Sequence, residues 1–481
     1  APLAATATMY QDTKGNVIPG LSEDGWKAVA VPGTVRGMDE ALRRWGTLPR
    51  ATVMAPAIRL ARDGFVLEPG DVMLLRTSTD GFRKDPAAAA IFLHPDGTPY
   101  AVGERLKQPD LAATLQRISD AGPDAFYRGP VAAAIVAASG KGGGILSSAD
   151  LEGYRTRVLP PITCSYHGTT VYTAPPPSGG GVALCEMLGI LDGEHLGELG
   201  LRSTAGVQRQ VEAMRRAFAD RQNLGDPAFV RNDVARLLSP DYAASVRAHT
   251  ATDRATPSAE LIPFDPVPHA ASAEAMAKDG EGQQTTHFSI VDKDGRAVAV
   301  TYTLNAWFGA KVVAAGTGVV MNDEMDDFSS KPGAPNMFGI VGSAANAIAP
   351  GKTPLSSMSP TVLAKDGHAV MVIGSPGGSR IPTITLESIL GVLDGHLDIA
   401  GAVNAPRIHE QWEPSTVQAE HGALSAEVAA ALQAMGYKIQ PHESWGSAEG
   451  ILVGGPSLAD RRPGVFGGLD LRHPGGAAIG E

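Results

Sequence analysis

The chain has 481 residues, of which 43% are hydrophobic and 19% charged, so it has room for two or three domains and can bury a sizeable core. Its formal net charge of −11 at pH 7 argues against a nucleic acid or an anionic membrane surface as its partner. No run reaches the roughly 18 apolar residues that a membrane-spanning helix needs, and the first residues lack the basic and apolar segments of a signal peptide.

The first half of the chain alternates helical and extended patterns. Apolar residues at helical spacing predict helices over 38–45, 57–62, 111–121, 182–191 and 207–221. Ser147 and Asp150 form the capping-box pattern that starts a short helix ending near Tyr154. A short strand is predicted over 171–173.

A turn rich in proline and glycine follows that strand. Residues 175–177 are all proline and stop the strand, and residues 179–181 are all glycine. Three glycines in a row let the backbone pass close to another part of the molecule. The two cysteines, Cys164 and Cys185, could pair in an oxidising compartment, but two buried free thiols are favoured.

Composition changes between about residue 246 and residue 284. Ala, Thr, Asp, Ser and Pro dominate there, and large apolar residues nearly vanish from 271 to 284, which predicts a mobile linker. The linker ends abruptly at Thr285, where a β-prone run begins. If the bond before Thr285 were cut, the freed α-amine, which titrates near ~7.7–8.0, could serve as base for the threonine's own hydroxyl. A β-prone pair of threonines that only opens a strand explains the same residues.

The second half is predicted to be centred on a sheet. Two runs with Asp-Gly turns, 288–304 and 361–373, indicate β-hairpins. The second hairpin ends in a glycine-rich turn before a helix over about 383–393. Backbone N–H groups at Gly377 and Gly378 could face an anion there, although a turn that needs positive φ uses the same residues.

Two polar segments remain. Residues 322–327 hold four carboxylates, which could hold a cation, although the ligand pattern of an EF-hand is absent. They could instead receive an ammonium group or form a solvated acidic loop. Ser356 and Ser357 offer two neighbouring hydroxyls, in what could also be an ordinary serine-rich turn. The scattered histidines do not form a zinc pattern, and the Gly-x-Ser-x-Gly motif of a serine hydrolase is absent from the sequence.

Together these motifs resemble those of the γ-glutamyltransferases (γ-glutamyltranspeptidases), in the same order and spacing. The segments that carry the resemblance in the second half are Thr285-Thr286-His287-Phe288-Ser289, Thr301-Tyr302-Thr303-Leu304-Asn305, Met325-Asp326-Asp327-Phe328, Pro354-Leu355-Ser356-Ser357-Met358-Ser359-Pro360 and Gly374-Ser375-Pro376-Gly377-Gly378-Ser379-Arg380. In the first half they are Val31-Pro32-Gly33-Thr34, Gly122-Pro123-Asp124-Ala125-Phe126-Tyr127 and Ala174-Pro175-Pro176-Pro177-Ser178, and near the end Asp470-Leu471-Arg472 with Gly475-Gly476-Ala477-Ala478.

The resemblance implies an α+β fold, the four-layer αββα sandwich of the N-terminal nucleophile hydrolases. It implies a precursor that cuts itself into residues 1–284, the large-subunit portion, and residues 285–481, the small subunit, which then form a heterodimer. No cofactor and no metal are expected. The family's large subunit begins earlier, with a region that carries an arginine for the substrate's α-carboxylate, so the chain is expected to be N-terminally incomplete. Bacterial members are typically periplasmic or secreted.

The resemblance also implies a role for each site residue. Thr285 matches the nucleophile, Thr303 a hydroxyl that assists it, and Gln284 the last residue before the cleaved bond. The positions that match substrate-binding groups are Asn305, Glu324 and Asp327 for an α-ammonium, Ser356 and Ser357 for an α-carboxylate, and Gly377 and Gly378 for the oxyanion hole. Residues 331–342 match the lid loop, with Phe338 at the position of a gating tyrosine.

The implied reaction is hydrolysis or transfer of the γ-glutamyl group of glutathione and related compounds, through a γ-glutamyl ester on Thr285. Two alternatives remain open. One is a cephalosporin or glutaryl acylase that uses the same machinery. Because a glutaryl group has no α-ammonium, Asn305 and Asp327 favour the γ-glutamyl substrate. The other is an unprocessed, inactive chain that lacks the N-terminal region.

Overall fold

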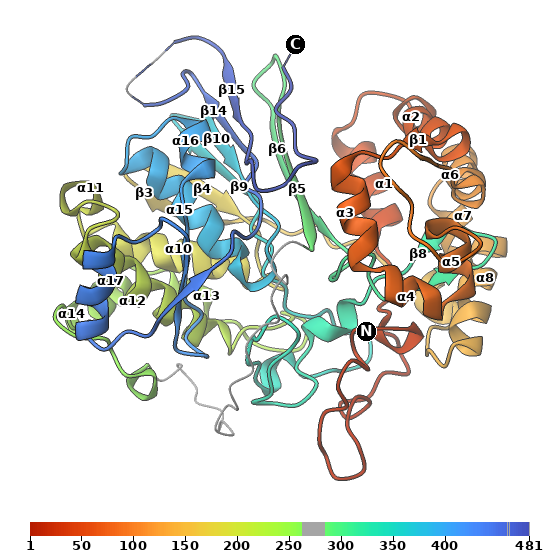
Figure 1. Ribbon diagram of the computed structural model, residues 1–481, viewed down its shortest axis with the longest axis horizontal. Coiled ribbons are helices and arrows are strands. Elements are labelled where there is room, and N and C mark those ends of the chain that lie inside the picture. The colour runs from red at the N-terminus through yellow and green to blue at the C-terminus, as the bar shows by residue number, and fades with distance from the viewer. Residues whose placement is uncertain (262–283, 459, 461, 481) are drawn as a thin grey trace. The chain divides into compact units, whose positions relative to one another are not determined.

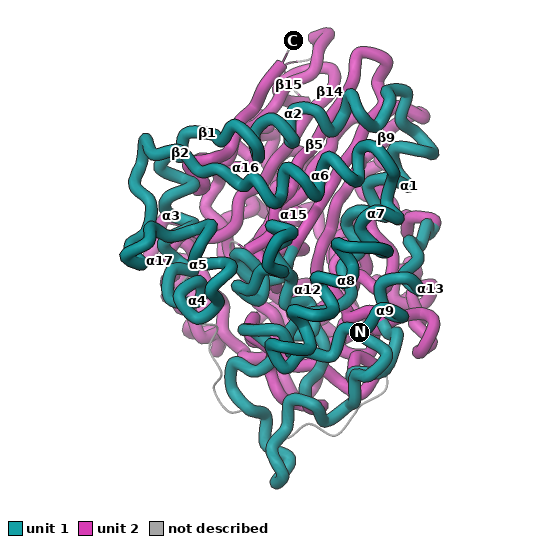
Figure 2. The backbone as a smooth tube through the Cα atoms, turned by 90° about the vertical axis from the view of Figure 1, so that its right-hand side faces the viewer, with its two compact units in different colours: residues 1–159, 304–330, 348–352 teal, residues 160–303, 331–347, 353–481 magenta. Residues whose placement is uncertain are grey.

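A computed structural model describes residues 1–261, 284–458, 460 and 462–480. The chain divides into two compact units (Figure 2). Unit 1 comprises Ala1–Leu159, Leu304–Ser330 and Ile348–Lys352, and unit 2 comprises Pro160–Thr303, Lys331–Ala347 and Thr353–Glu481. No described helix is both long and apolar enough to cross a membrane.

Unit 1 is mainly helical. Its helices are α1 (Thr34–Trp45), α2 (Arg50–Asp63), α3 (Pro69–Thr77), α4 (Thr79–Lys84), α5 (Pro86–Phe92), α6 (Pro109–Ala121), α7 (Asp124–Tyr127), α8 (Gly129–Lys141) and α9 (Ser148–Gly153). Its short strands are β1 (Phe65–Val66), β2 (Arg105–Leu106), β7 (Val313–Ala314) and β8 (Val319–Val320), and its 3-10 turns are η1 (Trp26–Ala28) and η3 (Glu324–Asp327). Helices α3, α5 and α6 begin with proline, whose missing N–H costs nothing in the first turn. The predicted capping box is confirmed at the start of α9, where Ser147 and Asp150 exchange hydrogen bonds.

Unit 2 is built on a six-stranded sheet in the order β15-β14-β10-β9-β4-β3, with antiparallel neighbours throughout. The strands are β3 (Ile162–Tyr166), β4 (Thr169–Thr173), β9 (Thr361–Lys365), β10 (His368–Ile373), β14 (Gly450–Val453) and β15 (Val465–Gly468). The helices are α10 (Gly180–Leu191), α11 (Leu196–Leu199), α12 (Thr204–Arg221), α13 (Val234–Leu237), α14 (Pro240–His249), α15 (Ile381–Leu393), α16 (Ile399–Asn404) and α17 (Ala426–Ala434), with 3-10 turns η2 (Ser258–Glu260), η4 (Ala344–Asn346) and η5 (Gly378–Arg380). A small sheet joins β11 (Ile408–His409), β12 (Val417–Glu420) and β13 (Ile439–His442).

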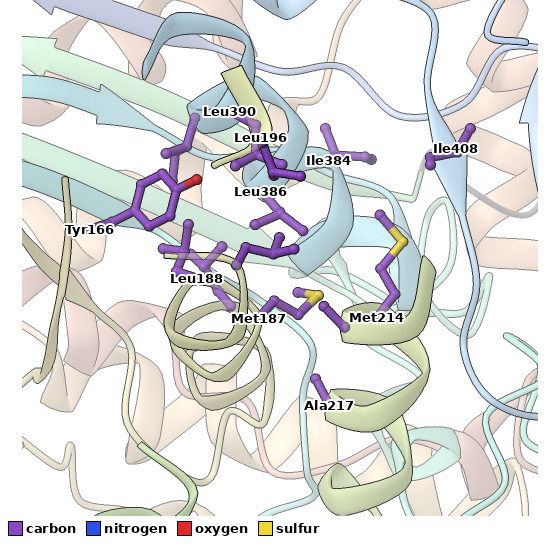
Figure 3. Close-up of a cluster of buried hydrophobic side chains, with 14 of the residues drawn as sticks. Tyr166, Met187, Leu188, Leu196, Met214, Ala217, Ile384, Leu386, Leu390 and Ile408 are labelled. Atoms are coloured by element: carbon purple, nitrogen blue, oxygen red, sulfur yellow. The ribbon is translucent and has the colours of Figure 1, made fainter. Parts of the chain in front are cut away.

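The main hydrophobic core lies between this sheet and its helices. Figure 3 shows Met187 and Leu188 of α10 beside Leu386 and Leu390 of α15, all fully buried. Helices α10 and α15 are buried around nearly their whole circumference because they pack on each other, while β3 and α12 also cover α10 and α16 also covers α15. The predicted helices over 182–191, 207–221 and 383–393 are therefore confirmed, each with a slightly earlier start.

A separate hairpin joins β5 (Thr285–Val291) to β6 (Ala297–Thr303) and packs against β9, β10 and β14. In Figure 1 it lies on the side of the six-stranded sheet away from α10 and α15. Unit 2 thus stacks helices, a sheet and a second pair of strands in layers. The predicted α+β class is confirmed, and so are both predicted hairpins.

The prediction of two free thiols is wrong. Cys164 on β3 and Cys185 on α10 form a disulfide across 21 residues of sequence, with 5.8 Å between their Cα atoms. Strand β3 packs directly on α10, and this brings the two sulfurs together. The residues of an edge strand do not reveal which helix packs on it, so the sequence left the pairing of the two cysteines open and favoured free thiols.

The first part of the predicted linker, from residue 246 to residue 261, is ordered and not mobile as the sequence suggested. Residues 246–249 end helix α14, and the segment after it is held to unit 2. Ala255 N donates to Met435 O, Arg215 donates to Thr256 O, and Trp412 Nε1 donates to Ser258 O. These bonds fix a segment whose polar composition suggested mobility. The rest of the predicted linker, residues 262–283, lies outside the described residues.

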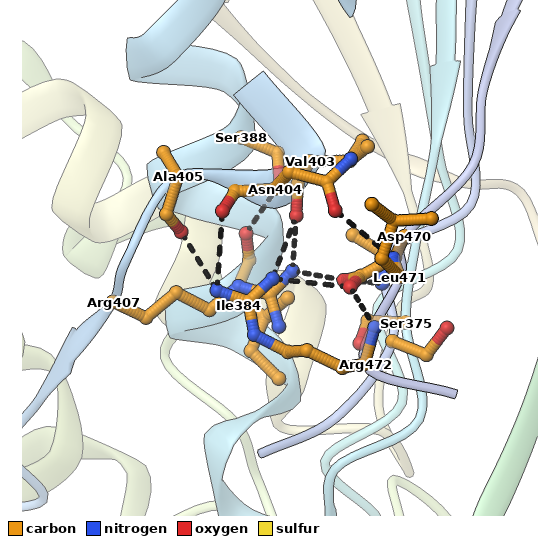
Figure 4. A network of polar contacts seen from close by, with 12 residues as sticks. Ser375, Ile384, Ser388, Val403, Asn404, Ala405, Arg407, Asp470, Leu471 and Arg472 are labelled. Atoms are coloured by element: carbon orange, nitrogen blue, oxygen red, sulfur yellow. Dashed lines mark hydrogen bonds and ion pairs between the residues drawn. The ribbon is translucent and has the colours of Figure 1, made fainter. Parts of the chain in front are cut away.

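The C-terminal segment is held by a buried ionic network (Figure 4). Asp470, which is fully buried, pairs with Arg407 at 2.5 Å and with Arg472 at 3.0 Å. Arg472 also pairs with Glu420 at 2.6 Å. The Asp470-Leu471-Arg472 motif therefore fastens the end of the chain to α16 and β12.

Candidate active site

The residues predicted to act on a substrate fall into two groups, one in each unit. In unit 2, Thr285 is the first residue of β5 and pairs with Thr303, the last residue of β6. The hydroxyl oxygens of the two threonines lie 3.2 Å apart. Thr285 is 8% exposed, as is Gln284 before it, so the peptide bond between them is largely shielded from water. The hairpin register thus gives Thr285 a hydroxyl neighbour that could pass or hold a proton.

The glycine-rich turn begins beside the same strand. The ring of His287, two residues after Thr285, lies against Gly374, where a Cβ atom would come within 2.2 Å of it. His287 is buried, and burial lowers its pKa to about 3, so the ring is neutral. Because Ser289 donates to Glu449 O at 2.8 Å, its hydroxyl oxygen accepts from His287 Nε2, and Nδ1 then accepts from Thr301. The fixed ring of His287 therefore limits how closely the glycine-rich turn at Gly374 can pack against β5.

Gly377 and Gly378 lie between β10 and α15. Both adopt positive φ, 141° and 57°, which favours glycine. Gly378 starts η5 and Ile381 starts α15, so the N–H groups of the diglycine lie just ahead of a helix N-terminus. No acceptor among the described residues takes a hydrogen bond from either N–H group. Two unused donors at a positive helix end are suited to an oxyanion.

Phe338, in the segment that matches the lid, lies against this turn. A Cβ atom on Gly378 would come within 2.6 Å of the phenyl ring, so a larger residue at 378 would displace it. The ring is 6% exposed, and Gln411 Nε2 donates to the carbonyl of Phe338 at 3.4 Å. Within unit 2, the ring of Phe338 therefore lies directly against Gly378.

The serine pair is held in a tight turn against the Pro-Pro-Pro-Ser-Gly segment. Ser356 N donates to Pro177 O at 2.9 Å, and Gly179 N donates to Ser356 O at 2.8 Å. Ser178 Oγ reaches Met358 O at 2.6 Å. The prediction that the glycine run allows a close approach is confirmed, because a Cβ on Gly180 would lie 2.0 Å from Ser357 O.

The second group lies in unit 1, around η3. Asn305 adopts φ 77° and donates through Nδ2 to Asp323 Oδ2 at 3.2 Å, and Ala306 N donates to Asp323 Oδ1 at 2.8 Å. Ser22 donates to Asp326 at 2.6 Å. Asp323 and Asp326 are buried, whereas Glu324 and Asp327 are only half-buried. The acidic run therefore contains two carboxylates that hold the loop and two that remain accessible.

The electrostatics of this loop favour a cation. Although Glu324 keeps part of its surface exposed, the burial of its carboxyl group, followed by repulsion from Asp327 and Asp323, raises the pKa of that group above its usual value. Burial also raises the pKa of Asp323. A ligand ammonium beside these carboxylates would favour their charged forms. The loop is thus suited to bind a positive group.

Comparison with known proteins agrees with these features. The family described as gamma-glutamyltranspeptidase matches residues 1–480. The glutathione hydrolase proenzyme of Pseudomonas sp. (strain A14) is 51% identical over 485 aligned residues, covering 100% of this chain and 82% of that protein. The chain belongs to the gamma-glutamyltranspeptidase family. It is therefore an enzyme of that family, and the predicted resemblance is confirmed.

Two further relatives support this assignment. The glutathione hydrolase proenzyme of Escherichia coli (strain K12) is 41% identical, with 94% of this chain and 76% of that protein aligned. The crystal structure of a cephalosporin acylase from Bacillus halodurans superposes with a TM-score of 0.81 at 27% identity, covering 100% of this chain and 83% of that chain. This gamma-glutamyltranspeptidase family member therefore shares its fold with an acylase as well.

Sequence reasoning missed two side chains of unit 2: Arg221, which contacts the predicted site residue Ser357, and His287, which lies against Gly374 at the start of the glycine-rich turn. His287 was quoted only as part of a motif, and Arg221 was assigned only to the end of a helix. Arg221 Nη2 donates to Ser357 Oγ at 2.9 Å across 136 residues of sequence. No local pattern reveals such a contact, although an arginine at the end of an otherwise buried helix is an unusual residue to bury.

Proposed function

We propose that the chain is a self-processing γ-glutamyl hydrolase and transferase whose nucleophile is Thr285. The observation that carries the proposal is the pairing of Thr285 with Thr303 at the open end of the β5–β6 hairpin, with their hydroxyls 3.2 Å apart. The names of the relatives, glutathione hydrolase proenzymes, support both the substrate class and the processing.

Activation precedes catalysis in this proposal. Thr285 Oγ attacks the carbonyl carbon of Gln284, the peptide C–N bond breaks, and an ester forms while the α-amine of Thr285 is released. Water then hydrolyses the ester and leaves a carboxylate on Gln284. Residues 1–284 and 285–481 remain associated as a large and a small subunit.

In the catalytic cycle the freed α-amine is the base. It takes the proton of Thr285 Oγ as the oxygen attacks the γ-carbonyl of the donor, and the N–H groups of Gly377 and Gly378 hold the resulting oxyanion. The C–N bond breaks, the leaving amine takes the proton, and a γ-glutamyl ester remains on Thr285. Water or an acceptor amine then attacks the ester, and the proton returns to Oγ.

Charge complementarity selects the donor. Asn305, Glu324 and Asp327 receive the α-ammonium, and Ser356 and Ser357 donate to the α-carboxylate. The accessible carboxylates of the η3 loop support the first role, and the fixed serine turn supports the second. Glutathione and other small γ-glutamyl compounds carry both groups.

Three anilides that differ by one group test this assignment. γ-Glutamyl, glutaryl and 4-aminobutanoyl p-nitroanilide share the scissile bond, but the second lacks the α-amine and the third lacks the α-carboxylate. We expect the highest kcat/KM for the γ-glutamyl compound. A higher kcat/KM for the glutaryl compound would identify an acylase instead, the second candidate that the Bacillus halodurans neighbour supports. No turnover of any anilide, with a chain that stays whole on a denaturing gel, would refute the enzyme proposal.

We also propose that the protein works in the periplasm or outside the cell. The Cys164–Cys185 disulfide supports this, because such bonds persist mainly in oxidising compartments. Fractionation of the producing cells, followed by detection of the two fragments, tests it. Recovery of the processed enzyme only with cytosolic markers would contradict the proposal.

A further inference from the structure

Helix α12 ends in a buried arginine that points at the serine pair. Arg221 is 5% exposed, and its Nη2 lies 2.9 Å from Ser357 Oγ, 3.2 Å from Ser356 O and 3.4 Å from Leu355 O. All three acceptors belong to one turn of unit 2. A guanidinium whose Nη2 donates to three oxygens of one turn helps to fix the position of that turn and places a positive charge beside it.

The direction of these bonds decides what the two hydroxyls can do. Arg221 cannot accept a hydrogen bond, so Ser357 Oγ is the acceptor in that contact. Ser356 Oγ likewise accepts from the N–H of Met358 at 3.1 Å. With their oxygens already accepting, both hydroxyls keep their hydrogens for another acceptor. Two neighbouring O–H donors, one of them polarised by a cation, match the two oxygens of a carboxylate.

The glycine run on the neighbouring segment makes this arrangement possible. A Cβ atom on Gly179 would lie 3.1 Å from both Cγ and Nε of Arg221, and one on Gly180 would clash with Ser357 O at 2.0 Å. The side chain of Arg221 therefore passes over a backbone without side chains to reach the serine turn. The glycines at 179 and 180 thus leave room for the contact between Arg221 and Ser357, which their own sequence does not reveal.

We propose that Arg221 is a positioning residue that holds the hydroxyls of Ser356 and Ser357 in place as two hydrogen-bond donors beside a positive charge. In this way it gives the enzyme its preference for γ-glutamyl substrates that carry an α-carboxylate. The inference rests on the proposed function, because it assumes that the serine pair receives that carboxylate. Arg221 acts through Ser357 and need not touch the substrate.

The test compares two substrates in wild type and three variants. kcat and KM are measured for γ-glutamyl and 4-aminobutanoyl p-nitroanilide with wild type, Arg221→Lys, Ser357→Ala and the double variant. A hydrogen bond to a charged group contributes about 1.5–3 kcal/mol, so Arg221→Lys should raise KM for the γ-glutamyl compound about 10-fold or more. For the 4-aminobutanoyl compound the change should stay below about threefold, and kcat should change little with either. Arg209→Gln, another α12 arginine, which pairs with Glu194 at 2.9 Å, is the control and should leave both substrates unaffected.

The double variant tests whether Arg221 acts through Ser357. We expect it to lose little more than Ser357→Ala alone, because residues in one hydrogen-bond network are not additive. Equal losses on both substrates in Arg221→Lys, or full additivity, would overturn the inference. If Arg221→Lys does not fold, Ser357→Ala must still raise KM for the γ-glutamyl compound more than Ser356→Ala does, since only Ser357 Oγ accepts from Arg221. The reverse order would also overturn the inference.

The outcomes separate the inference from the proposed function. If wild type turns over the γ-glutamyl compound but neither serine variant changes its preference over the 4-aminobutanoyl compound, the carboxylate role of the serines fails. If the serine variants change the preference and Arg221→Lys does not, only the role of Arg221 fails.

Discussion

Replacing Asp470 with asparagine should destabilise unit 2 strongly. The Asp470 carboxylate is fully buried and accepts from Arg407 at 2.5 Å, from Arg472 at 3.0 Å and from Ala448 N at 2.8 Å (Figure 4). Arg472 keeps Glu420, but among the described residues Arg407 makes its direct ion pair only with Asp470. Asparagine preserves the shape and removes the charge, so a guanidinium that is 2% exposed loses its counter-ion. Breaking a buried pair in this way costs about 3–5 kcal/mol.

Urea unfolding followed by tryptophan fluorescence measures this loss as a lower midpoint for Asp470→Asn. Asp460→Asn is the matched control, because Asp460 pairs with Arg462 on the surface, where both side chains are more than half exposed. The control should change the free energy of unfolding by less than about 1 kcal/mol. Equal midpoints for the two variants would refute the reasoning.

The same pair predicts a dependence on pH. Burial alone would raise the pKa of Asp470, but Arg407 and Arg472 outweigh it and hold the pKa below its usual value. A depressed pKa contributes stability that is present above the unfolded pKa, about 3.9, and is lost as pH falls through the folded value. The gap between wild type and Asp470→Asn should therefore stay constant from pH 5 to 8 and narrow only in stronger acid.

Three further changes have defined outcomes. Thiol titration of the denatured, unreduced protein should find no free thiol, and Cys164→Ser with Cys185→Ser should lower stability by about 2–4 kcal/mol; two reactive thiols before reduction would contradict the disulfide. Burial raises the pKa of Glu449 to about 7, so ionisation of this carboxyl group destabilises the folded wild type as pH rises. The stability of Glu449→Gln relative to wild type should therefore increase between pH 5 and 8. A stability difference that becomes smaller over this range would argue against the burial of Glu449. Thr303→Val removes one hydroxyl beside Thr285 and should lower kcat about 3- to 10-fold; an unchanged kcat would exclude an assisting role.

The strongest sequence patterns predicted individual helices and hairpins, but not how these pack together. The Asp-Gly turns fixed both hairpins, and the hairpin register then pairs Thr285 with Thr303. The Ser147 capping box likewise predicted α9. Helix α8 was missed because its run of alanines and valines has no polar face to give a period. Helix α2 begins at Arg50, seven residues before its predicted start, and the helix as a whole is only weakly amphipathic, so its first residues give little helical pattern.

Contacts between distant segments could not be predicted. The disulfide depends on β3 packing on α10, and the bond from Arg221 to Ser357 depends on the glycine run that lies between them. The acidic run was recognised as a group, but its division into buried and accessible carboxylates depends on Ser22 and Asn305, which lie elsewhere in the sequence. In each case the residue that makes the contact belongs to another helix, strand or loop, and a local sequence pattern contains no information about that residue.

The most direct test of the central claim identifies the residue that carries the covalent intermediate. The enzyme is mixed with a γ-glutamyl donor, quenched in acid, digested and analysed by mass spectrometry, with Thr285→Ala as the control. We expect a small fragment that begins at Thr285 and carries a γ-glutamyl ester on that residue, while Thr285→Ala stays uncut and unlabelled. A γ-glutamyl group on any other residue, or cleavage at another bond in an active enzyme, would contradict the account.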